Sequence, residues 1–91
     1  MSFRILLIED EAGLVMTLSD LLTGEGYEVE TATDGETGYL KALEGGFDLI
    51  VLDVMLPKRS GYEVCSMLRH QGAEVEILQT LMRRKSGRTA S

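Results

Sequence analysis

The chain has 91 residues, 44% of them hydrophobic, a composition typical of one small globular domain rather than a disordered segment. Residues 1–82 contain all fifteen acidic residues and five of the nine basic ones, a balance of −10, and residues 83–91 return +4. This net negative charge over residues 1–82 argues against nucleic-acid binding by the domain itself.

Two further classes of protein are excluded by the absence of their signals. No apolar run approaches the ~20 residues that a membrane span needs, and no signal-peptide pattern opens the sequence. The single cysteine, Cys65, cannot form an internal disulfide, which indicates a reducing compartment. We therefore expect a cytoplasmic domain without membrane attachment.

The first predicted elements are a strand, a helix and a second strand. FRILLIED (residues 3–10) is an apolar run with an acidic end, which is typical of a strand. YEVETA (residues 27–32) alternates apolar and polar residues and predicts a half-exposed edge strand. Between them Gly24 and Gly26 end a helix. Its apolar face is predicted from the helical spacing of Leu14, Val15, Leu18, Leu21 and Leu22.

A second helix and a buried strand follow. Thr33 and Glu36 have the spacing of a capping box, so we expect a helix that begins near Asp34 and ends before Gly45. The dense apolar run over residues 48–52 has no alternation. Such a run predicts a strand buried on both faces, as in a parallel sheet.

The third helix is predicted from a second capping-box pattern, formed by Ser60 and Glu63. Val64, Cys65 and Leu68 are expected to face inward, and Gly72 is the expected stop. Residues 75–82 fit either a short strand or a helical face, and we favour a strand.

Alternating strands and helices with short connections predict a parallel, doubly wound α/β sheet. The strands begin near residues 4, 27 and 48, about 22 residues apart. A five-stranded domain at that spacing would need roughly 110 residues. We therefore expect an incomplete sheet of three to four strands.

Acidic residues supply the candidate chemistry. Glu9 and Asp10 close the first strand, and Asp53 closes the third. If those strands are neighbours, the three carboxylates converge at the carboxyl edge of the sheet, where ligands bind in open parallel sheets. Mg²⁺ suits such a cluster because it prefers oxygen ligands. A carboxylate is also able to act as a nucleophile and form an aspartyl phosphate, and Asp53 is the best placed of the three.

Three segments resemble the first three strand-helix units of a bacterial response-regulator receiver domain: ILLIEDE, GYEVETATDGETGYLKAL and FDLIVLDVMLPKRSGYEVCSMLR. The match covers roughly residues 3–78. Its most specific element is D-x-M-L-P-x-x-x-G, which begins at Asp53 and ends at Gly61, together with the acidic pair Glu9-Asp10.

The resemblance implies a flavodoxin-like sheet of strand order 2-1-3-4-5. It implies that Asp53 is the phospho-acceptor and that the phosphoryl group comes from a phosphohistidine on a sensor histidine kinase. It also implies that Asp10, Asp53 and the backbone carbonyl of Met55 ligate Mg²⁺ (or Mn²⁺), with Glu9 acting through water. The family signals rather than catalyses, so we expect no enzyme.

The C-terminal segment departs from the family pattern. In the family a Thr or Ser ends the fourth strand, but here the register puts Leu81 at that place and Thr80 one residue early. The Lys that ends the fifth strand has no counterpart; Lys85 lies in a basic segment unlike the family's. This end resembles that of a truncated or frame-altered gene, or of a chain shortened by engineering. We therefore expect a phospho-accepting module of a two-component system with impaired switching, or alternatively a non-signalling remnant that serves structure or self-association.

The predicted organisation is a partial receiver domain over residues 1–82 and a basic, flexible tail over residues 83–91. An incomplete sheet would expose apolar surface and an unpaired edge. We therefore expect a homodimer whose contact includes the third strand and residues 73–85.

Overall fold

The structure is a computed structural model, and it describes residues 2–53, 56, 60–72 and 75–80. In the described residues four parallel strands form one sheet in the order β2-β1-β3-β4, which confirms the doubly wound fold class and the predicted order as far as the fourth strand. The strands are β1 (Arg4–Ile8), β2 (Glu28–Ala32), β3 (Leu49–Asp53) and β4 (Glu76–Thr80). The helices are α1 (Ala12–Gly24), α2 (Gly35–Glu44) and α3 (Gly61–His70).

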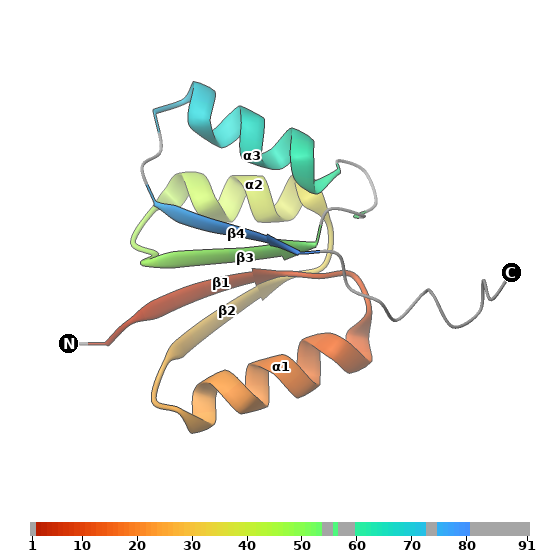
Figure 1. The fold of residues 1–91 in the computed structure, drawn as a ribbon, viewed down its shortest axis with the longest axis vertical. Coiled ribbons are helices and arrows are strands. Elements are labelled where there is room, and N and C mark those ends of the chain that lie inside the picture. Colours follow the sequence, from red (N-terminus) through yellow and green to blue (C-terminus); the bar gives the residue numbers. More distant parts are fainter. Residues whose placement is uncertain (1, 54–55, 57–59, 73–74, 81–91) are drawn as a thin grey trace, which may run out of the picture.

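The helices cover the two faces of the sheet in different ways. Figure 1 shows α1 on one face and α2 and α3 on the other. The main core lies under α2 and α3, and each of its large side chains stabilises the fold by about 1.5–3 kcal/mol through burial. Its buried members are Leu6, Ile8, Ala32, Ile50, Leu52, Val64 and Leu68.

The α1 face is less completely covered. Here α1 packs mainly against β2, and it has no fully buried residue. Leu21, which the helical spacing placed on the inward face, is 61% exposed, so that part of the prediction is wrong. The half of this face formed by β3 and β4 is partly open: Val51 is half-buried, and Leu78 beside it is 53% exposed.

The two helices that follow β2 and β3 have side-chain caps. Ser60 caps α3 as predicted, because its Oγ accepts a hydrogen bond from the Glu63 backbone N–H at 3.1 Å. The prediction that Thr33 caps the second helix is wrong. Asp34 is the N-cap, and its carboxylate accepts hydrogen bonds from the Thr37 N–H at 2.7 Å and the Thr37 hydroxyl at 3.2 Å.

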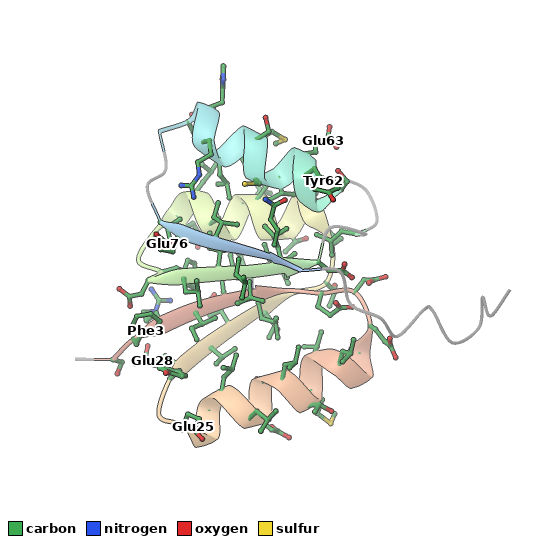
Figure 2. The ribbon with its side chains drawn as sticks, viewed as in Figure 1. Phe3, Glu25, Glu28, Tyr62, Glu63 and Glu76 are labelled. Carbon is green, nitrogen blue, oxygen red and sulfur yellow. The ribbon has the colours of Figure 1, made fainter. Side chains whose placement is uncertain are left out.

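Arg4 ties together the amino ends of three strands. Its guanidinium donates to the Gly46 carbonyl at 3.1 Å, pairs with Glu30 at 3.0 Å and lies 4.6 Å from the centre of the Phe47 ring. Glu28, labelled at this end of the sheet in Figure 2, is a further ion-pair partner at 3.5 Å. These contacts fix the register of the strands at the edge opposite the candidate site.

The ambiguous segment after the third helix is a strand over Glu76–Thr80, which confirms the favoured prediction for those residues; positions 81 and 82 lie outside the described part. β4 pairs in parallel with β3, and its last residue, Thr80, is the register partner of Asp53. None of the helices that the structure describes has both the length and the hydropathy to span a membrane.

Candidate functional site

β1 and β3 are neighbours at the centre of the sheet, as the convergence of the acidic residues requires. Ile8 of β1 is the register partner of Leu52 of β3. The residues that follow, Glu9 and Asp53, therefore leave the two strands at the same level. Asp53 is the last residue of β3, one position beyond the strand end that the sequence predicted.

The structure brings the three predicted carboxylates together. Glu9, Asp10 and Asp53 each offer one carboxylate oxygen, and these atoms all lie within 4.8 Å of one another. Glu9 and Asp53 are fully buried, and Asp10 is half-buried. Buried carboxylates are costly unless they are paired or coordinate a metal. Their oxygens also form the kind of donor set that hard divalent cations prefer.

Backbone hydrogen bonds hold Glu9 in place. Its N–H donates to the Ala32 carbonyl at 3.0 Å, which extends the pairing of β1 with β2 by one residue. Its carboxylate Oε2 accepts a hydrogen bond from the Glu11 backbone N–H at 2.9 Å. One carboxylate oxygen of Glu9 is therefore oriented by the turn that leads into α1. This contact could not be predicted from the residue pattern, because its donor is a backbone N–H and not a side chain.

The cluster lies where the chain crosses to opposite faces of the sheet. After β1 the chain enters α1 on one face, and after β3 it enters α3 on the other (Figure 1). Neighbouring strands whose helices diverge in this way leave a crevice beyond their carboxyl ends, which is where open α/β sheets bind ligands. The acidic cluster therefore occupies the position expected of a ligand site.

Several predicted features lie outside the described residues. These are the proposed carbonyl ligand Met55, Leu81 at the predicted hydroxyl position, and the basic tail over residues 83–91. The expected impairment of switching depends on the C-terminal part of this set, so it stays a prediction.

Comparison with known proteins agrees with the fold. A family model described as response regulator receiver domain matches residues 5–86. The alkaline phosphatase synthesis transcriptional regulatory protein PhoP of Bacillus subtilis is 49% identical over 78 residues, 86% of this chain and 32% of PhoP. The chain spans about a third of the length of the curated relatives it matches.

Two solved structures that contain a response regulator are also similar to this chain. The response regulator protein TrrA from Thermotoga maritima, in complex with Mg(2+)-BeF, is 35% identical with a TM-score of 0.80, over 92% of this chain and 75% of that one. A structure of the histidine kinase ThkA in complex with TrrA also matches, with 35% identity and a TM-score of 0.81 over 87% and 68% of the two chains. Fold and sequence similarity agree, and the chain belongs to the response regulator receiver domain family.

Proposed function

We propose that this chain is a phospho-accepting module of a two-component system, in which Asp53 takes a phosphoryl group from a sensor histidine kinase. The observation that carries this proposal is the gathering of three carboxylates at the crossover of the sheet, with Asp53 fully buried at the end of a central strand. The similar protein TrrA, solved with Mg(2+)-BeF and with a histidine kinase, supports it.

Mg²⁺ is the proposed cofactor, held by Asp10, Asp53 and the backbone carbonyl of Met55, with Glu9 acting through water. The carboxylate cluster fits a hard divalent cation, because its donors are all oxygen atoms and are close enough to share one ion. The bound cation would offset the negative charge of the carboxylates and of the incoming phosphoryl oxygens.

Asp53 has the position of the nucleophile. One of its carboxylate oxygens forms a bond to phosphorus as the phosphorus–nitrogen bond of the phosphohistidine breaks. The ring nitrogen keeps the electron pair of that bond, and with its other nitrogen protonated the histidine leaves as neutral imidazole. The burial of Asp53 restricts the carboxylate to few orientations, and phosphoryl transfer depends largely on such positioning.

Phosphorylation by a small donor tests this function without knowledge of the kinase. We expect acetyl phosphate with Mg²⁺ to add one phosphoryl group to the wild-type chain, as read by intact mass. Asp53→Asn and omission of Mg²⁺ should each abolish the gain, whereas Asp20→Asn, an exposed acid on α1, should not. A folded wild-type chain whose mass stays unchanged over hours would contradict the proposal.

We also propose that two copies of the chain associate through β3 and its neighbour β4. The half-buried Val51 and the 53% exposed Leu78 form apolar surface on this half of the α1 face. Residues 73–74 and 81–85 of the predicted contact lie outside the described part of the chain. Sedimentation equilibrium at micromolar concentration should give a dimer, and an ideal monomer would rule this association out.

A further inference from the structure

The outer edge of β4 forms one boundary of the described sheet. In the part of the chain that the structure describes, β4 ends the sheet and pairs with β3 alone. An edge strand presents backbone N–H and C=O groups that readily pair with another strand. The centre of this strand is Leu78, which is large, apolar and 53% exposed.

We infer that two copies pair antiparallel along their β4 edges, about a two-fold axis at Leu78, so that one continuous sheet runs through both copies. This inference rests on the self-association proposed above. It narrows the contact to β4, with β3 one strand further inside the sheet, and adds direction and register. Such a contact is isologous, since the same five residues, Glu76–Thr80, meet their own copies.

Geometry selects the register. Residues directly opposed in an antiparallel pair have side chains on the same face of the sheet. The two-fold axis must therefore lie midway between one residue and its own copy, because an axis at a peptide bond would oppose residues that point to different faces. An axis at Leu78 is the one that places every β4 residue opposite another β4 residue. Leu78 then faces its own copy, Glu76 faces Thr80, and Ile77 faces Gln79.

Charge selects the same register. Glu76 is exposed and lies at the amino end of β4 (Figure 2), so an axis at Glu76 would set two carboxylates directly against each other. With the axis at Leu78 the two Glu76 residues are offset by four residues, roughly 13 Å at the rise of a strand. That separation exceeds the Debye length of about 8 Å at physiological salt.

Apolar contact favours a second copy over an unrelated strand. Leu78 is the register partner of Val51, so the two side chains lie side by side on the α1 face. Directly opposed side chains in an antiparallel pair have Cβ atoms about 4.5–5.5 Å apart. The pairing of Leu78 with its copy therefore covers the exposed centre of the strand. A strand with an apolar centre and polar ends is complementary to itself.

Cysteine cross-linking tests the register. In a Cys65→Ser background, Leu78→Cys should form disulfide-linked dimers under mild oxidation, because opposed Cα atoms lie about 4.5–5.5 Å apart, within disulfide range. Glu76→Cys on the same strand should not, because its own copy is roughly 13 Å away. Cross-linking of both variants to the same extent would overturn the register.

A charge substitution supplies the second measurement. Leu78→Lys should weaken dimerisation at least tenfold in sedimentation equilibrium, because two like charges would then oppose each other. The matched control is Leu40→Lys on α2, since Leu40 is also 53% exposed and should leave the dimer unchanged. A wild-type dimer insensitive to both substitutions would overturn this inference and leave self-association standing, whereas a wild-type monomer would overturn both.

Discussion

Gly38 of α2 lies directly against Ile8 of β1: a Cβ placed on Gly38 would meet Ile8 Cδ1 at 2.5 Å and the Ile8 Cγ atoms at 2.9 Å. Ile8 is fully buried and is followed in the chain by Glu9, a member of the acidic cluster. The absence of a side chain at position 38 therefore sets how closely α2 approaches the strand that leads into the site.

Gly38→Ala should lower the free energy of unfolding by up to about 2 kcal/mol, because overpacking typically costs about 1–3 kcal/mol and the helix-propensity gain of about 1 kcal/mol offsets only part of it. The control is Gly24→Ala at the end of α1, where an added Cβ meets nothing within 4 Å. That variant should be neutral or slightly stabilised. Equal effects in urea denaturation would mean that the contact with Ile8 is unimportant.

The cap of α2 gives a second pair of variants. Asp34→Ala should destabilise the protein by about 1 kcal/mol, because the helix loses the carboxylate that accepts from the Thr37 N–H. Thr33→Ala should change stability by less than about 0.5 kcal/mol, because Thr33 is exposed and is not the cap residue. A larger loss from Thr33→Ala in thermal or urea unfolding would restore the capping-box assignment.

Metal binding tests the acidic cluster. Asp10→Ala should weaken Mn²⁺ or Mg²⁺ binding at least tenfold, because it removes one of three carboxylates that lie within 4.8 Å of one another. Asp10 suits this test better than Glu9 or Asp53, which are fully buried, whereas Asp10 is half-buried. Removal of its carboxylate should therefore disturb the packing least. Asp20→Ala on the exposed surface of α1 is the control. Equal affinity of wild type and Asp10→Ala, by calorimetry or Mn²⁺ relaxation, would remove Asp10 from the site.

The convergence of the acids was predictable because two physical rules determine it. A run such as Leu49–Leu52 without alternation predicts a parallel strand, and parallel strands align their carboxyl ends at one edge. Any acid that ends or directly follows such a strand must then lie at that edge. Glu9 and Asp53 meet this condition. Their proximity could therefore be predicted on the assumption that β1 and β3 are neighbours, which they are.

The errors arise where local patterns compete with tertiary packing. The periodicity that included Leu21 describes an apolar helical face, but the extent of burial depends on what covers that face, and α1 packs mainly on β2. Thr33 and Asp34 are both good cap residues, and their neighbours alone do not distinguish them. The backbone conformation after β2 determines which of the two is the N-cap. The strand extends to Ala32, and Asp34 is the residue with extended backbone directly before the helix.

The measurement that tests the central claim most directly is the location of the phosphoryl group. An aspartyl phosphate is an acyl phosphate, so borohydride reduces it to homoserine, and peptide sequencing by mass spectrometry then identifies the modified residue. After treatment with acetyl phosphate and Mg²⁺, we predict homoserine at position 53, lost when Mg²⁺ is omitted and reduced by Asp10→Ala. Homoserine at another acid, or modification that persists without Mg²⁺, would contradict the assignment of Asp53 as the phospho-acceptor.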